Sequence, residues 1–188
     1  RNYTHLKELE DKEREELLHI NIDKDAEVIV PLLGNEVSPE TLIEIGASLN
    51  SKSKIQTLNI MEVPDQTSLD AFREKKPKTK SLERMVKTLS SRIKLDINFE
   101  SIATHKLSST MQALSELTNI EGLILSWNGR AYNGIFFNNP IGWIVSHINS
   151  NFALFKCNGV TRFEKILLSI RHNSKDADKL IEATNSLC

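Results

Sequence analysis

From Ala26 onward, strand-like and helix-like segments alternate along the chain. Apolar runs rich in β-branched residues predict five strands, over Glu27–Leu33, Lys54–Val63, Leu95–Ala103, Gly122–Leu125 and Phe152–Phe155. Apolar residues at helical spacing predict a helix in each interval, over Leu42–Leu49, Leu82–Ile93, Leu107–Leu114 and Ile141–Ile148. Such alternation is typical of parallel strands joined by right-handed crossovers. The sequence therefore predicts an α/β fold with an open, doubly wound, mainly parallel five-stranded sheet and helices on both faces.

Local signals place two details of this fold. Gly34-Asn35 predicts a turn after the first strand, and Ser38 followed by Pro39 predicts an N-cap and a first helical residue. In the third strand, the alternation predicts that Leu95, Ile97, Phe99 and Ala103 share one side.

The charge balance bears on the choice of partner. The 188 residues contain 24 Lys and Arg against 25 Asp and Glu, so the net charge is −1. A general nucleic-acid binder usually has a basic excess, and we therefore expect no nucleic-acid partner.

The two cysteines, Cys157 and Cys188, are too few for a disulfide scaffold, which favours a reducing compartment. No apolar run approaches the roughly 18 residues of a membrane span.

The end of the chain repeats its beginning. A shift of 138 residues (166 minus 28) places Val28-Ile29-Val30 on Ile166-Leu167-Leu168. Six identities follow in the same register without a gap: Asn35 with Asn173, Leu42-Ile43-Glu44 with Leu180-Ile181-Glu182, and Ser48-Leu49 with Ser186-Leu187. An internal repeat of this kind predicts a second structural unit.

Three segments follow from these patterns. Residues 1–25 are polar and charged and are expected to form a lead-in or linker helix. Residues 26–158 are expected to form one complete α/β domain, and residues 159–188 the first strand and helix of a truncated second repeat. A lone strand and helix cannot bury its own faces. We therefore expect this tail to pack on the first unit, to swap between chains, or to need further sequence.

Two loops are expected to line a ligand site. In a doubly wound sheet, ligands bind outside the carboxyl ends of the strands, where the strand order reverses. Glycine-rich turns before a helix suit phosphate, because backbone N–H groups can approach it closely. The candidate residues after the first and fourth strands are Pro31, Leu32, Gly34, Ser126, Trp127, Gly129, Arg130, Asn139 and Pro140.

The element order, the loop Ser126–Gly134 and the helix from Asn139 resemble the universal stress protein family. The resemblance implies an ATP motif of Gly-x-x-Gly, nine residues, then Gly and Ser or Thr, with an acidic residue after the first strand. Here the first glycine falls on Ser126, the second is kept as Gly129, and the last pair falls on Asn139-Pro140. The Pro31–Gly34 turn replaces the acidic position. Because Pro140 lacks a backbone donor and the hydroxyl is missing, we expect a degenerate loop and no cofactor, with Gly129 and Arg130 still favouring an anion.

A narrower resemblance covers Glu27–Cys188. The strings Val28–Asn35, Leu123–Arg130 and Lys156–Leu167 resemble the tandem cytosolic domains that follow the membrane portion of prokaryotic amino-acid permease-type transporters. This resemblance implies a non-enzymatic regulatory or assembly domain, cytoplasmic and attached to an inner or plasma membrane protein. It would act as a homodimer and on the membrane portion of the same transporter.

Two alternatives stay open. One is a stand-alone tandem universal stress protein that binds ATP or another adenine nucleotide. The other is the cytosolic domain of a different carrier, such as a cation–chloride cotransporter. Trp127 and Tyr132 flank Gly129 and suit either base stacking or capping of the sheet. Ser126 lacks the Gly-x-Ser-x-Gly elbow of hydrolases, and the five histidines share no metal-ligand spacing, so we expect neither catalysis nor a metal.

Overall fold

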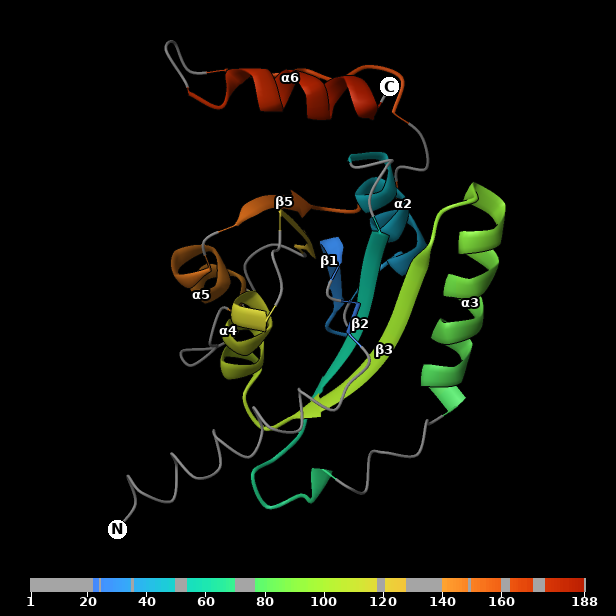
Figure 1. Ribbon diagram of the computed structural model, residues 1–188, viewed down its shortest axis with the longest axis vertical. Helices are drawn as coiled ribbons and strands as arrows, with labels where there is room; N and C mark the ends of the chain where they lie inside the picture. Colours follow the sequence, from blue (N-terminus) through green and yellow to red (C-terminus); the bar gives the residue numbers. More distant parts are fainter. Residues whose placement is uncertain are drawn as a thin grey trace.

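The computed structural model describes residues 22–23, 25–34, 36–49, 54–69, 77–117, 121–127, 140–148, 150–159, 163–170 and 175–187. They form a central sheet with helices on its faces (Figure 1). The lead-in expected over residues 1–25 lies almost wholly outside the described residues, as does the glycine-rich part of the loop after the fourth strand.

Strands and helices alternate as the sequence predicts. In chain order the elements are β1 (Ala26–Leu32), α2 (Pro39–Leu49), β2 (Lys54–Glu62), α3 (Pro77–Ile93), β3 (Ile97–Thr104), α4 (Leu107–Leu117), β4 (Gly122–Ser126), α5 (Pro140–His147), β5 (Asn151–Phe155) and α6 (Ala177–Ser186). Helix α3 begins at Pro77, five residues before the first apolar residue of its predicted stripe. The buried Thr79 belongs to the inner face of this added turn.

The sheet has the strand order β3-β2-β1-β4-β5, and every pairing is parallel. Strand β1 is central, with Val30 beside Thr57 of β2 and Ile29 beside Leu123 of β4. The chain moves outward from β1 in one direction as far as β3, and then crosses to β4 on the other side. This order confirms the predicted doubly wound sheet and makes the boundary between β1 and β4 the switch point.

Two hydrophobic cores fill the spaces between the sheet and its helices. Side chains of α2 and α3 pack on one face of the sheet, and side chains of α4 and α5 pack on the other. Helix α2 lies close to β1 and β4. A Cβ added to Gly46 would lie 3.1 Å from the Val30 side chain and 3.4 Å from the Ile124 side chain. Gly46 is therefore the residue that allows this close approach of helix and sheet.

The N-terminus of α2 is formed as the sequence predicts. The Thr41 backbone N–H donates to Ser38 Oγ at 3.4 Å, and the two hydroxyl groups lie 2.7 Å apart. Pro39 is the first helical residue. Ser38 thus satisfies a backbone donor that the first turn leaves without a helical acceptor.

Strand β3 places apolar side chains on both faces of the sheet. Leu95 precedes the strand, and Ala103 is only half-buried. Ile97 and Phe99 pack in the core of α2 and α3, whereas Ile102 packs in the core of α4 and α5. Leu95 packs against the same core as Ile97 and Phe99, so the predicted shared side is confirmed for these three residues. Ile102 adds an apolar side chain on the opposite face, because helices cover both faces of the sheet and β3 contributes to both cores.

The described part of the tail packs on the first unit beside α2. Phe163 and Leu187 contact the core of α2 and α3 beside β5, and the Phe163 ring meets Phe155 edge-on with centroids 6.2 Å apart. Helix α6 has no buried residue and lies beyond α2 (Figure 1). Residues 163–170 are neither helix nor strand, so the strand predicted at Ile166–Leu168 is absent. A parallel strand needs a neighbouring backbone, and β1 already has a strand on each side. That the tail begins a second repeat stays a prediction.

Candidate ligand-binding site

The predicted loops meet at the switch point. Because β1 and β4 are paired in parallel, their carboxyl ends lie side by side, with the loop from Leu33 next to Ser126 and Trp127. The structure therefore brings together the described part of the two loops that the sequence selected. Gly129, Arg130 and Asn139 lie outside the described residues, and Pro140 is the first residue of α5.

The two candidates inside β1 belong to the core. Pro31 and Leu32 are buried, and Leu32 packs among the side chains under α2 and α3. Gly34 is exposed and adopts a φ of 87°, a left-handed conformation that favours glycine. It turns the chain away from the sheet directly after β1.

Trp127 continues the pairing between β4 and β5. Its backbone N–H donates to the Phe155 carbonyl oxygen at 2.8 Å. The Lys156 ammonium lies 5.9 Å from the centre of its exposed indole ring, within the range of a cation–π contact. Trp127 thus closes the carboxyl end of the sheet while presenting aromatic surface to solvent.

An acidic side chain that the sequence interpretation missed lies in the loop after β1. The Leu33 and Gly34 backbone N–H groups donate to Oε1 and Oε2 of Glu36 at 2.5 and 2.9 Å. The signal was present in the sequence, since Glu36 follows the Gly34-Asn35 turn directly.

Polar groups at the ends of β2 and β3 cap the start of α4. The Leu107 N–H donates to Glu62 Oε1 at 3.4 Å, and the Lys106 N–H donates to Thr104 Oγ1 at 3.0 Å. The Thr110 hydroxyl donates to the same Thr104 oxygen at 2.7 Å. These contacts satisfy backbone donors at the helix N-terminus.

The geometry separates Ser126 from His105, one of the two histidines that a hydrolase could combine with it. Ser126 ends β4 and His105 follows β3, and these strands are three positions apart in the sheet, about 14 Å. His105 Nε2 lies 2.8 Å from the Thr67 carbonyl oxygen, and His147 Nδ1 lies 2.9 Å from that of Trp143.

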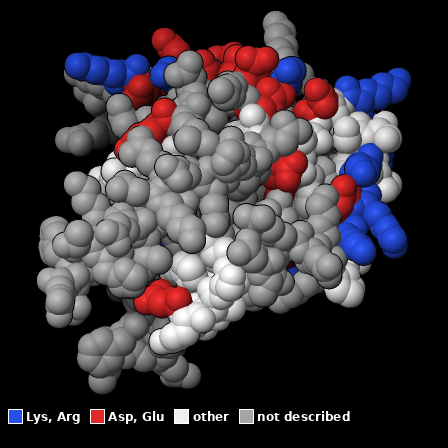
Figure 2. All heavy atoms as spheres, turned by 60° about the horizontal axis from the view of Figure 1, so that its bottom comes forward, with Lys and Arg blue, Asp and Glu red and all other residues white. Residues whose placement is uncertain are grey.

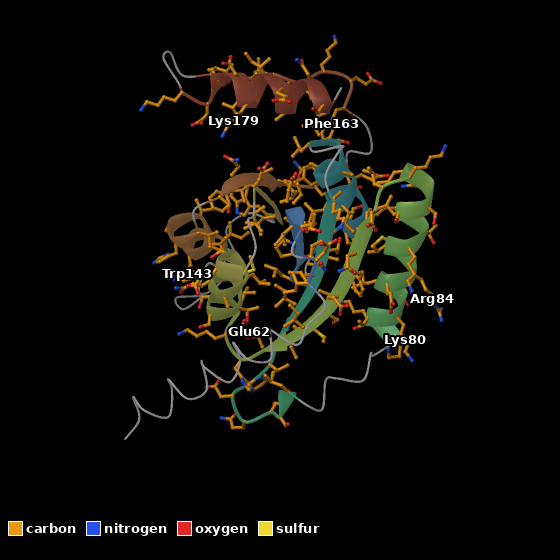
Figure 3. All side chains as sticks on the ribbon, in the orientation of Figure 1. Glu62, Lys80, Arg84, Trp143, Phe163 and Lys179 are labelled. Carbon is orange, nitrogen blue, oxygen red and sulfur yellow. The ribbon has the colours of Figure 1, made fainter. Side chains whose placement is uncertain are left out.

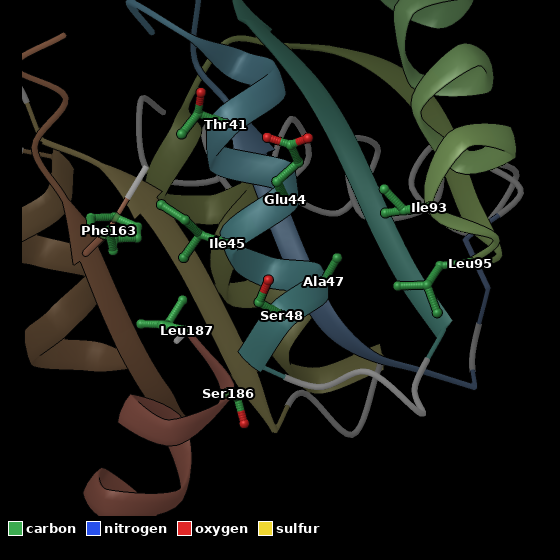
Figure 4. Close-up of a pocket in the computed structure, with 10 residues that line it drawn as sticks. All are labelled: Thr41, Glu44, Ile45, Ala47, Ser48, Ile93, Leu95, Phe163, Ser186 and Leu187. Carbon is green, nitrogen blue, oxygen red and sulfur yellow. The ribbon is translucent and has the colours of Figure 1, made fainter. Parts of the chain in front are cut away.

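A pocket of about 550 Å³ lies between α2, the end of α3 and the tail (Figure 4). Ile45, Phe163 and Leu187 form apolar walls, and Glu44 lies at its margin, ion-paired with Arg92. The sequence did not indicate this pocket, because its walls come from segments far apart in the chain. Figure 3 shows Phe163 near one end of the molecule and Glu62, at the carboxyl end of β2, near the other.

The described residues contain neither a membrane-spanning helix nor a cluster of metal ligands. Within these ranges, no helix is both long and apolar enough to span a bilayer. In the same part of the chain, no three His, Cys, Asp or Glu side chains are grouped as metal ligands. In the view of Figure 2, Lys and Arg side chains lie toward the margins, with Asp and Glu side chains between them.

Comparisons with known proteins identify the fold. No family model and no curated protein matches the sequence. Among solved structures, the universal stress protein UspA from Lactobacillus plantarum matches with a TM-score of 0.50 and 11% identity, over 71% of this chain and 99% of that chain. A universal stress protein family protein from Arabidopsis thaliana, solved with AMP bound, gives 0.46 and 15%, over 71% and 93%. One from Burkholderia pseudomallei gives 0.45 and 8%, over 71% and 98%. The likeness to UspA shows that this chain has the universal stress protein fold.

Proposed function

We propose that this chain is a non-enzymatic regulatory domain that works by assembly, with a second copy as its first partner. The observation that supports this proposal is the outer strand β5, which pairs only with β4 among the described strands. Its Leu154 is 48% exposed. An outer strand with free backbone groups and apolar side chains is a template for pairing with another chain.

The other outer strand is less suited to this role. Strand β3 carries Asn98, Glu100 and Ser101, and polar or charged side chains on an outer strand disfavour pairing between copies. Asn98 donates to Gln56 at 2.9 Å, and the Asn59 side chain donates to Ser101 at 2.9 Å, so both are engaged within the sheet. We therefore place the proposed dimer contact at β5.

Light scattering of the wild-type chain and of two variants tests the dimer. Leu154→Lys places a charge on β5, and Val145→Lys places the same charge on α5, where an apolar residue of similar exposure lies outside the sheet. We expect about twice the monomer mass for the wild type and for Val145→Lys, and the monomer mass for Leu154→Lys. A wild-type mass equal to one chain at every concentration contradicts the proposal.

We further propose that the domain is the cytoplasmic part of an amino-acid permease-type transporter and contacts its membrane portion. The support is the resemblance of the segments Val28–Asn35, Leu123–Arg130 and Lys156–Leu167 to such domains. Sequencing the coding region upstream of Arg1 tests this. Several hundred residues with repeated apolar spans of roughly 20 residues are expected. A start codon a few residues before Arg1 contradicts it.

The second candidate is a stand-alone protein that binds an adenine nucleotide. The exposed Trp127 ring at the switch point favours it, since aromatic rings stack on bases. Calorimetry with ATP and Mg²⁺ distinguishes the two functions. No heat is expected for the assembly domain, whereas micromolar binding that Trp127→Ala abolishes supports the nucleotide-binding protein.

A further inference from the structure

The loop after β1 holds a carboxylate with two successive backbone donors. The Leu33 and Gly34 N–H groups point at the same Glu36 carboxylate, one at each oxygen, at 2.5 and 2.9 Å. This convergence depends on Gly34, whose φ of 87° lies in the left-handed region. Successive N–H groups that turn toward one point form a concave site for an anion.

The chemistry of this site is not restricted to a side chain. Each of the two N–H groups needs one acceptor oxygen, and a phosphate or a carboxylate supplies both oxygens from one anion. Hydrogen bonds from backbone N–H groups to a charged oxygen are stronger than those between neutral groups. The Glu36 carboxylate therefore occupies a position that a phosphate or carboxylate ligand also fits.

The position is accessible from solvent and lies where a ligand of this fold class is expected. The loop begins at the carboxyl end of β1, beside the end of β4, at the switch point. Gly34 is exposed, and a Cβ added to it would meet no atom within 4 Å among the described residues. Glu36 is half-buried, and within the described ranges no basic side chain lies within ion-pair distance of it.

We propose that the loop after β1 is an oxyanion-binding site that Glu36 occupies from within the same chain, and that Glu36 thereby keeps phosphate and carboxylate ligands out of the switch point. An incoming anion has to displace the side chain and then approach its negative charge. A neutral or cationic ligand that does not use the two donors meets neither obstacle. This inference is independent of the assembly role proposed above, because it concerns only the ligand selectivity of the loop.

Thermal unfolding in the presence of inorganic phosphate tests the proposal in the full chain. Glu36→Ala frees both donors and removes the charge. Glu40→Ala is the matched control, since Glu40 lies four residues further on and pairs with Arg92 on the protein surface at 2.8 Å. Sodium chloride of equal ionic strength corrects for general salt effects. We expect a saturable phosphate-dependent rise in the unfolding midpoint for Glu36→Ala alone, with phosphate binding at least about tenfold tighter than in the wild type.

Three other results overturn the proposal. If phosphate raises the unfolding midpoint of the wild type and of Glu36→Ala equally, the Glu36 side chain does not exclude phosphate. If phosphate raises the midpoints of Glu36→Ala and Glu40→Ala equally, the loop is not a specific site. If phosphate does not raise the midpoint of Glu36→Ala, the two donors bind no external anion. Acetate in place of phosphate separates the two ligand sources, because binding of both shows an oxyanion site and binding of phosphate alone shows a phosphate site.

The backbone amide signals of Leu33 and Gly34 locate the binding. Phosphate is expected to shift these two signals in Glu36→Ala and to leave them in place in the wild type. If Glu36→Ala does not fold, Glu36→Gln replaces it, since the glutamine keeps one acceptor oxygen and loses the charge. Phosphate then shifts the two signals in Glu36→Gln, and unchanged signals contradict the proposal.

Discussion

Two regions of the molecule share a sequence pattern and differ in structure. Leu42-Ile43-Glu44 in α2 and Leu180-Ile181-Glu182 in α6 are identical tripeptides in a matching register. Leu42 and Ile43 are fully buried, whereas Leu180 and Ile181 are 42% and 43% exposed. The preceding segments differ even more, since Ile29 is fully buried and its counterpart Leu167 is 93% exposed. The same apolar pattern thus forms a core in one place and a surface in the other.

The two segments differ in burial because different strands and helices lie beside them. Strand β1 has β2 on one side and β4 on the other, and Gly46 lets α2 lie close to both β1 and β4. The position equivalent to Gly46 in the tail is Thr184. Burial of apolar surface stabilises a folded segment. A strand and helix with no sheet to pack on bury little apolar surface and gain little stability. The following predictions test this explanation.

The largest difference is expected between Ile29 in β1 and its counterpart Leu167 in the tail. Ile29→Ala should lower the free energy of unfolding by about 3 kcal/mol, because it leaves a cavity between the sheet and the helices. Leu167→Ala should change it by less than about 0.5 kcal/mol, since an exposed side chain leaves no cavity. Urea unfolding followed by circular dichroism measures both. Equal effects contradict the comparison and indicate that another surface covers the tail.

The helix position that approaches the sheet comes next. Gly46→Leu should destabilise the protein by about 2 kcal/mol, because its Cβ already meets Val30 at 3.1 Å and the longer side chain has no space. Thr184→Leu, the same change in the tail, should cost less than about 0.5 kcal/mol. The unfolding midpoints of the two variants in urea measure both losses of stability. A Gly46→Leu protein as stable as the wild type would show that α2 does not depend on this close approach.

A smaller effect is expected where the tail contacts the domain. Phe163→Ala removes the edge-on contact with Phe155 and should cost about 1 kcal/mol of tail attachment. Hydrogen exchange measured by mass spectrometry is expected to show faster exchange in α6 and unchanged exchange in α2. Leu180→Ala, an exposed residue of the same tail, serves as the control and should leave the exchange of α6 close to that of the wild type. Unchanged α6 exchange in Phe163→Ala means that the tail is held elsewhere.

The smallest effect concerns a charged contact between the residues that precede β1 and the first residue of β2, for which the tail sequence has no counterpart. The Lys54 ammonium lies 3.2 Å from Asp23 and 3.4 Å from Asp25, and these carboxylates, Asp23 foremost, raise the pKa of Lys54. The tail has Thr161 and Phe163 at the corresponding positions. Because the pKa is raised in the folded state, this stabilisation is present below the ordinary lysine pKa and is lost as the pH rises through the raised value.

Nuclear magnetic resonance titration of the Lys54 side chain measures this contact. Asp23→Asn should return the pKa of Lys54 toward its ordinary value, and Asp25→Asn should lower it by less. The reverse order of the two variants contradicts the assignment of Asp23 as the main partner.

The sequence predicted where in the fold the candidate site lies. The alternation of strands and helices placed the loops after β1 and β4 at one switch point, and the structure pairs these strands. Pro31 and Leu32 were predicted to line the site, but their side chains lie in the core, since β1 is central and covered on both faces. Glu36 was missed because its role depends on how the chain turns at Gly34, a local geometry that spacing does not specify.

By itself, the sequence determined the order of the elements, the N-cap at Ser38 and the repeat between α2 and α6, because these depend on neighbouring residues and on periodicity. Only the tertiary structure decided that Ile29 is buried and Leu167 exposed, that β3 contributes to both cores, and that Glu36 folds back on two backbone donors. The physical reason is that burial and strand pairing depend on partners distant in the chain. An apolar pattern shows which face of a segment is apolar. Whether that face is buried depends on the strands and helices that pack against it.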